Sequence, residues 1–297
     1  MLQLVTYRNA QGIRTGLMQN DKIYASGRYA SMQDVLDDWA QASERLPDVA
    51  QRLADRSPEM DAELLAPLPA PRNIYFAGAN YKDHVAEMKR RLGLPLDEDP
   101  KAGGQSPWFS TKATGSTVVG PGARVERPRG TRMLDWELEL AVVIGQRCKD
   151  VPVERALDVV AGYTVANDLS ARDHIAREGV PDDSPFRWDW IGQKTFDGSC
   201  PLGPAITPAA FIPDPHKLQM RLWVNGELMQ DSNTGQMIYD VREQIAHLSS
   251  CVTLLPGDVI LTGTPAGVGM ARNRFLQPGD VVRQWIENIG VFEITIG

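Results

Sequence analysis

Residues 135–145 read Asp-Trp-Glu-Leu-Glu-Leu-Ala-Val-Val-Ile-Gly, and this stretch determines how we interpret the fold. Side chains alternate between the two faces of a strand, so Asp135, Glu137 and Glu139 share one face and apolar side chains the other. The apolar run at 141–144 indicates a strand that enters a hydrophobic core. Carboxylates on one buried face repel each other and stay ionised only beside a cation. The alternative is a solvent-exposed strand face.

A third carboxylate, Asp168, follows the apolar segment 159–165. A side chain at the end of a buried strand commonly projects into a site. Three carboxylates without cysteine or paired histidine suit a hard ion that keeps water ligands, so we expect Mg²⁺ or Mn²⁺, with Ca²⁺ possible, rather than Zn²⁺. On local spacing alone, Asp168 is equally compatible with a helix N-cap that pairs with Arg172 four residues later.

Short apolar segments separated by glycine and proline turns dominate from residue 73 onward. They predict strands at 74–77, 136–144, 159–165, 220–224, 259–262, 281–286 and 291–296. Helical spacing is clearest at 153–160 and 241–248. Many short strands with few helices predict an α+β, β-rich domain over residues 73–297, resembling a sandwich or barrel.

Residues 1–66 predict a small N-terminal α/β module. Its patterns indicate strands at 2–7, 13–18 and 22–24 and helices at 32–39 and 49–53. Alternating prolines then hold residues 67–72 in an extended linker.

Composition excludes several classes of protein. A net charge of -7 and a pI near 5.2 give no electrostatic footprint for nucleic acid or anionic lipid. No segment approaches the roughly 20 consecutive apolar residues of a membrane helix, and the N-terminus lacks a signal-like pattern. Cys148, Cys200 and Cys251 form no CxxC pair or disulfide framework. We expect a cytoplasmic protein that binds neither nucleic acid nor membrane.

Five motifs occur in a characteristic order along the chain. They are residues 80–87 (NYKDHVAE), 135–139 (DWELE), 167–173 (NDLSARD), 193–198 (QKTFDG) and 255–269 (LPGDVILTGTPAGVG). The chain thereby resembles the fumarylacetoacetate hydrolase family, in particular its acylpyruvase and 2-oxo acid hydrolase or decarboxylase members. The resemblance is strong from residue 73 to 297 and loose before it. It implies a mixed β-roll or barrel catalytic domain.

The resemblance implies that Glu137, Glu139 and Asp168 bind a divalent metal and that Lys194 is catalytic and faces the substrate. Lys194 lies among apolar neighbours, where an ammonium group is costly without an anionic partner such as an enolate. An ordinary snorkelling lysine is the alternative. Lys112 also stands at a position typical of the family, where we expect a structural role.

The resemblance further implies that His84 and Glu87 form a catalytic dyad that activates water on a mobile lid. On a helical turn, residues three apart share a face and can hydrogen-bond, and imidazole accepts a proton near neutral pH. An exposed salt bridge is the alternative. The polar segment 87–105, which ends in Gly103-Gly104, predicts the lid itself.

Substrate contacts are implied for Thr264 and Gly263, in a turn able to present N–H groups to an anion, and for Arg172. The sequence departs from the family pattern at two places. Residues 178–189 form an insertion that we expect near the pocket mouth. A glutamine common after the arginine is absent, which makes His174 a secondary candidate for substrate contact.

The leading functional hypothesis is metal-dependent hydrolysis of a C–C bond in an acylpyruvate or related β-diketo acid from aromatic or sugar-acid catabolism. The alternatives are decarboxylation of an oxaloacetate-like acid, or isomerisation, hydration or dehydration of a 2-oxo acid through an enolate held at the metal. A non-catalytic binding protein would lack the triad or the dyad, and this chain has both. The resemblance to the family also implies a homodimer.

Overall fold

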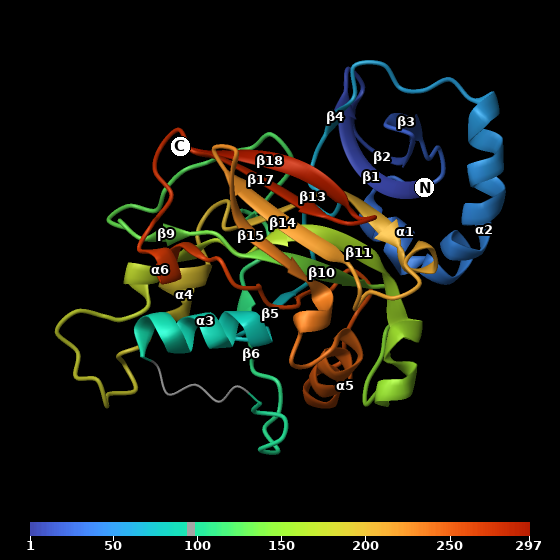
Figure 1. The fold of residues 1–297 in the computed structure, drawn as a ribbon. Coiled ribbons are helices and arrows are strands. Elements are labelled where there is room, and N and C mark those ends of the chain that lie inside the picture. The colour runs from blue at the N-terminus through green and yellow to red at the C-terminus, as the bar shows by residue number, and fades with distance from the viewer. Residues whose placement is uncertain (94–98) are drawn as a thin grey trace.

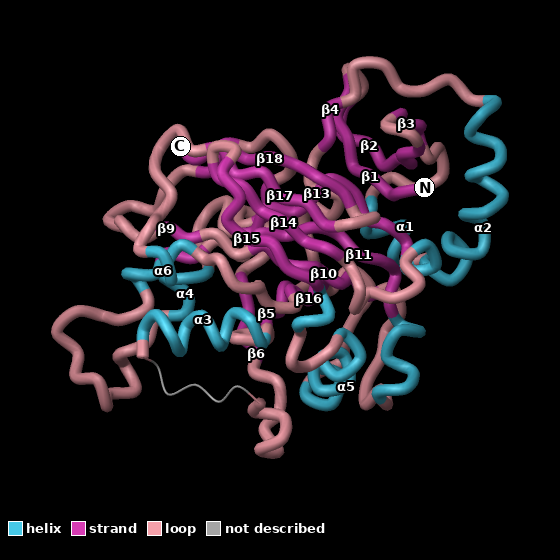
Figure 2. Tube along the Cα trace, in the orientation of Figure 1, coloured by secondary structure: helices cyan, strands magenta, loops and turns pink. Residues whose placement is uncertain are grey.

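The computed structural model describes residues 1–93 and 99–297. Strands form the centre of the molecule and helices lie around it (Figure 1, Figure 2). The α+β, β-rich prediction is therefore confirmed.

Eleven strands of the described residues form the larger sheet. Nine follow in the spatial order β3 (Lys22–Ala25), β2 (Gly12–Gln19), β1 (Leu2–Asn9), β13 (Cys200–Pro208), β11 (Val160–Asn167), β10 (Leu138–Ile144), β16 (Val259–Leu261), β5 (Ile74–Ala77) and β6 (Phe109–Lys112). In addition, β4 (Glu63–Leu64) pairs with β1, and β7 (Val118–Val119) pairs with β13.

A second sheet covers one face of the first (Figure 1). Its order is β15 (Glu227–Asn233), β14 (Gln219–Val224), β17 (Val281–Ile286), β18 (Gly290–Ile296) and β8 (Arg124–Val125). Leu140 of β10, Leu222 of β14 and Ile294 of β18 share the core between the sheets. A further pair joins β9 (Leu134–Asp135) to β12 (Ser170–Ala171) beside the site.

The helices surround these sheets. The α-helices are α1 (Met32–Asp37), α2 (Trp39–Arg52), α3 (Lys82–Leu92), α4 (Trp190–Lys194), α5 (Val241–Cys251) and α6 (Gly269–Arg272). The 3-10 turns are η1 (Leu53–Asp55), η2 (Val153–Val159), η3 (Arg172–His174), η4 (Ala209–Phe211) and η5 (Thr234–Gln236). Within the described part of the chain, no helix is both long and apolar enough to cross a membrane.

Two predicted helices differ from the structure. The one predicted at 49–53 is the end of the longer α2 and the first residue of η1, and the earlier part of α2 was missed because it contains Pro47. The one predicted at 153–160 is the 3-10 segment η2, which leads directly into β11. In both cases the apolar positions were identified correctly but the length or type of the helix was not.

The N-terminal module is continuous with the large sheet, because Leu4 of β1 pairs with Ile206 of β13. Its strands and α1 and α2 lie together at the upper right of Figure 1. The predicted linker is packed against it: Leu68 is buried, and the Thr6 hydroxyl donates to Pro67 O at 2.8 Å. The division into domains at 1–66 and 73–297 stays a prediction.

The segment predicted as a lid is partly helical. Residues 87–92 belong to α3, which ends at Gly93 in a left-handed conformation with φ 64°. Residues 94–98 lie outside the described part of the chain. Residues 100–104 form turns. Closure of this segment over a substrate stays a prediction.

Candidate active site

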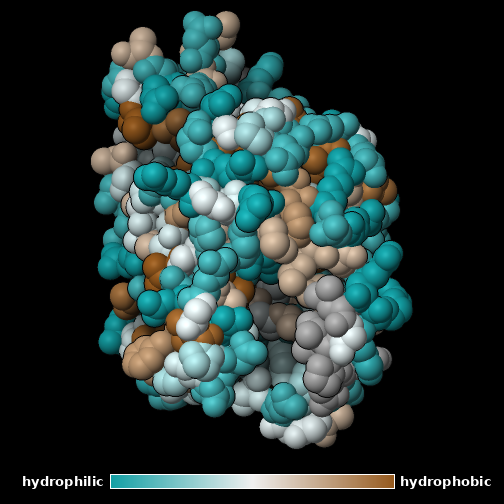
Figure 3. Space-filling model, turned by 90° about the vertical axis from the view of Figure 1, so that its left-hand side faces the viewer, coloured by the Kyte–Doolittle hydropathy of each residue, from teal (hydrophilic) through white to brown (hydrophobic). Residues whose placement is uncertain are grey.

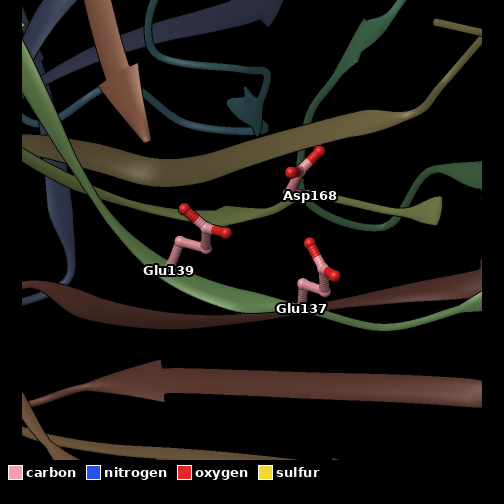
Figure 4. Close-up of side chains that lie close together, drawn as sticks. All are labelled: Glu137, Glu139 and Asp168. Atoms are coloured by element: carbon pink, nitrogen blue, oxygen red, sulfur yellow. The ribbon is translucent and has the colours of Figure 1, made fainter. Parts of the chain in front are cut away.

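The three carboxylates predicted to bind a metal lie together and point into a common space (Figure 4). Glu139 lies in β10, Glu137 directly precedes this strand, and Asp168 directly follows β11. The two strands pair antiparallel, and the Asp168 N–H donates to Glu137 O at 2.9 Å. One oxygen of each carboxylate lies within 4.8 Å of the others, and all three side chains are buried. Antiparallel pairing thus brings the triad together.

Two buried lysines already neutralise part of this charge. Lys194 Nζ donates to Glu137 Oε2 at 2.5 Å and to Asp168 Oδ2 at 2.6 Å. Lys112 Nζ forms an ion pair with Asp168 Oδ1 at 2.5 Å. It also donates a hydrogen bond to the backbone oxygen of Lys194 at 2.5 Å. Burial disfavours the Lys194 ammonium, but Asp168 and Glu137 outweigh it and raise its pKa. Lys194 therefore faces the site as a cation.

Arg172 orders the other side of the triad. Its Nη2 donates to Glu137 Oε1 at 2.5 Å and its Nε to Asp135 Oδ2 at 2.9 Å. Asp135 also accepts the backbone N–H of Gly269 at 2.6 Å, at the start of α6. Burial opposes ionisation of Glu137, but Lys194 and Arg172 outweigh it and lower its pKa. This arginine thus holds a predicted metal ligand in place, and its predicted contact with substrate stays untested.

Glu139 differs from its two neighbours. Among the residues the structure describes, no cation lies within ion-pair distance of it, and its Oε2 accepts only the Gly263 N–H, at 2.6 Å. Gly263 has φ 97°, and a Cβ there would lie 2.8 Å from the Asn80 side chain, so glycine is required. Burial, then the charges of Asp168 and Glu137, raise the pKa of Glu139 well above its ordinary value. This carboxylate lacks a positive partner.

The donor set fits a divalent cation. The connected cluster contains Asp135, Glu137, Glu139, Asp168, Lys112, Arg172 and Lys194. When all four carboxylates are ionised to receive a cation, they leave one net negative charge against the three cations, and Glu139 is the carboxylate without a positive partner. Three buried oxygen donors at this spacing match the ligands that Mg²⁺ or Mn²⁺ prefer.

His84 and Glu87 lie one turn apart on α3, and both are buried. The predicted hydrogen bond between them is not formed. Glu87 Oε2 accepts the Gly267 N–H at 2.7 Å, and His84 Nδ1 has no hydrogen-bond partner. Burial, opposed by Glu137, lowers the pKa of His84 to about 4. The imidazole is therefore neutral at pH 7 and free to accept a proton.

A cavity of about 330 Å³ joins these groups. It opens on the face that carries α3, α4 and α6, which Figure 3 shows hollowed in its lower half. The predicted site residues that line it are His84, Glu137, Glu139, Arg172, Lys194 and Thr264.

The remaining candidates for substrate contact lie differently. The Thr264 hydroxyl lines the cavity but already accepts from Gln230 Nε2 at 2.9 Å and donates to the backbone of β10. Gly263 contacts Glu139, so its backbone orients a carboxylate. His174 is not among the residues that line the cavity. Its substrate contact stays a prediction without support from this geometry.

The sequence does not identify three residues of the cavity wall as site residues: Trp108, Trp190 and Gln193. Trp190 and Gln193 lie on the same short helix as Lys194, and Trp190 precedes that lysine by one turn. This spacing was the available signal. Trp108 directly precedes β6 and reaches the cavity only because of the tertiary fold. No local sequence pattern could therefore indicate its role.

Lys112→Met should lower the free energy of unfolding by about 3 kcal/mol without metal, because it leaves the buried Asp168 carboxylate short of a partner. Saturating Mg²⁺ should restore part of the loss. Denaturant unfolding with and without Mg²⁺ measures both effects. The control is Lys217→Met, whose ion pair with Asp214 is exposed to solvent and whose loss should leave stability nearly unchanged. Equal, small losses would show that Lys112 does not support the site.

Comparisons with known proteins place these features in a family. The family model described as "Fumarylacetoacetate (FAA) hydrolase C-terminal" matches residues 73–297. The chain therefore belongs to the fumarylacetoacetate hydrolase family, as the five motifs predicted.

Individual relatives have different activities. Oxaloacetate tautomerase fahd2 of Xenopus laevis, named as mitochondrial, is 42% identical over 245 residues, covering 82% of this chain and 70% of its own. A fumarylacetoacetate hydrolase from Exiguobacterium antarcticum superimposes with a TM-score of 0.80 at 31% identity, covering 100% of this chain and 99% of its own. Maleylpyruvate hydrolase from Sphingobium sp. SYK-6, solved with manganese(II) and pyruvate, gives 0.75 at 29% identity and covers 99% and 98%. These names describe hydrolysis and tautomerisation on one fold.

Proposed function

We propose that the protein catalyses the metal-dependent enolisation of a small 2-oxo acid. The observation that carries the proposal is a neutral His84, whose Nδ1 has no hydrogen-bond partner, lining the same cavity as Glu137 and Glu139. The oxaloacetate tautomerases among its relatives support it, since their name describes interconversion of keto and enol forms.

A divalent ion on Glu137, Glu139 and Asp168 would polarise the 2-oxo carbonyl and thereby acidify the neighbouring C3–H. The chain's own groups then move the proton. His84 takes it from C3, the C–H electron pair forms the C2=C3 double bond, and the carbonyl oxygen gains the negative charge. Lys194, held as a cation by two carboxylates, stabilises that oxygen. Return of the proton from His84 to the oxygen gives the enol.

Hydrolysis of a C–C bond in an acylpyruvate is the second candidate. It is favoured by the likeness to the maleylpyruvate hydrolase and uses the same enolate as leaving group. It additionally needs a water that His84 deprotonates. Glu87 is held by Gly267, so in this arrangement it does not assist the imidazole directly. Decarboxylation, a cytoplasmic location and a homodimer stay predictions.

Exchange of C3 protons with D₂O, followed by proton NMR, tests the proposal on oxaloacetate and acetylpyruvate with Mg²⁺ or Mn²⁺. We expect exchange at least ~10²-fold above the uncatalysed rate, as positioned general bases achieve. Excess chelator should remove the acceleration. Cleavage of acetylpyruvate without accelerated exchange in oxaloacetate would instead make the protein a hydrolase.

A further inference from the structure

The cavity is lined by charged and by aromatic side chains, which adjoin each other. Its charged lining consists of Glu137 and Glu139 of the triad together with Arg172 and Lys194. Its apolar lining consists of Phe76, Trp108 and Trp190 together with aliphatic side chains. A 2-oxo acid bound at the charged groups therefore has aromatic rings within reach of the substituent on its C3 atom.

The three rings form a connected wall. The centroids of Trp108 and Trp190 are 4.8 Å apart, and Phe76 lies 6.1 Å from Trp108 and 6.5 Å from Trp190. Lys194 Nζ lies 5.1 Å from the Phe76 centroid, so the wall begins directly beside the group that faces the reacting end. Trp108 and Trp190 are 45% and 37% exposed, so their faces are accessible to a ligand. Such a surface stacks on planar groups.

The charges argue against a second carboxylate on the substrate. Among the described residues that line the cavity, the cations are Arg172 and Lys194, and both are already paired with carboxylates. With Glu139 ionised the cluster carries one net negative charge, so a bound divalent ion brings it to one positive charge. A monocarboxylate substrate then balances the site, whereas a dicarboxylate restores a negative charge in a buried place.

Gln193 supplies an independent indication of a ligand. It lines the cavity, is 3% exposed, and its Oε1 has no hydrogen-bond partner. Buried amide groups are normally satisfied, so this one is available to a bound molecule. A neutral amide between Trp190 and Lys194 suits the enol hydroxyl or a neutral polar group better than a carboxylate.

We infer that the preferred substrate is a 2-oxo monocarboxylic acid whose C3 substituent is planar and unsaturated, such as an aryl group, stacked on Trp108 and Trp190. This inference rests on the proposed enolisation and defines its substrate class. An aryl substituent also stabilises the enol by conjugation. The C2=C3 double bond of that enol then lies next to the aryl group stacked on the aromatic wall.

The test compares C3-proton exchange of phenylpyruvate and oxaloacetate in the Mg²⁺-loaded enzyme. We expect kcat/KM for phenylpyruvate to exceed that for oxaloacetate by ~10-fold or more, as an apolar pocket discriminates by such factors. Trp108→Ala and, separately, Trp190→Leu should reduce this ratio by ~10-fold. Trp285→Ala, which removes a half-buried indole from β17, should leave the ratio unchanged. Phenylpyruvate should also quench wild-type tryptophan fluorescence more than oxaloacetate does.

The outcomes are distinguishable. Wild-type enzyme that prefers oxaloacetate overturns the aryl inference while leaving enolisation intact. A ratio unaffected in both tryptophan variants also overturns it, because the wall would then not contact the substituent. No accelerated exchange with either acid refutes the proposed function, and the inference fails with it.

Discussion

Replacement of Glu139 by alanine should abolish calorimetrically detectable binding of Mg²⁺ or Mn²⁺ and leave the fold intact. Glu137 and Asp168 already have lysine partners, whereas Glu139 has only a backbone N–H, so its charge is the one most available to an added cation. At a metal concentration 100 times Kd, wild type should gain about 2.7 kcal/mol of stability that the variant does not gain. Titration calorimetry and thermal unfolding measure both effects. Activity should disappear with the metal.

Glu139→Gln provides the matched control for packing, since its amide oxygen can still accept the Gly263 N–H. The raised pKa of Glu139 means that the folded protein retains a proton that the unfolded chain releases. Without metal, stability should therefore fall as pH rises above the ordinary value of about 4.5, and Glu139→Gln should remove that fall. Unchanged metal binding in either variant would refute the metal centre.

Much of the central fold follows from short-range patterns. The alternation at 135–139, followed by an unbroken apolar run, predicts the strand β10, and every residue of that strand is buried. Apolar residues on both faces are what a strand between two layers requires. The carboxylates at its entrance then become buried as well, which is why the same stretch indicates both the core and the metal site.

Other elements could not be predicted from local patterns. The strand β13 contains three prolines and a glycine in nine residues, which normally argues against a strand, yet it lies between β1 and β11. Tertiary pairing outweighs propensity there. The helix α3 was recognised only as a turn carrying His84 and Glu87, because its second half is charged and resembles a loop.

In the candidate site, too, local spacing predicts some neighbours and tertiary contacts decide the others. Glu137 and Glu139 lie together as their spacing predicts, because residues two apart on an extended chain point to the same side. Lys112 reaches Asp168 across 56 positions of sequence, and Trp108 meets Trp190 across 82. Such contacts depend on how the strands order themselves, which spacing does not encode. The unformed bond between His84 and Glu87 has the same cause, since Gly267 from a distant loop takes the carboxylate.

His84→Ala should lower the rate of C3-proton exchange by ~10²–10⁴-fold, because no other neutral base is expected at that position. Cleavage of an acylpyruvate should fall by a similar factor, since its attacking water must lose a proton. Decarboxylation of oxaloacetate should be affected less, because CO₂ departs without proton abstraction and Lys194 still stabilises the enolate oxygen. All three rates are measured on the same Mg²⁺-loaded preparations.

The pH dependence of the wild type identifies the base independently. Burial lowers the pKa of His84 to about 4. The imidazole is therefore unprotonated, and able to act as a base, at pH values above about 4. The acid limb of kcat/KM should therefore lie near pH 4, well below the value of about 6.5 for an exposed histidine, and it should vanish in His84→Ala. His247→Ala, a histidine on α5 outside the cavity lining, is the control. Equally small losses in all three reactions, with the acid limb retained, would show that His84 only packs against the site, and the proton would then have to be carried by another group.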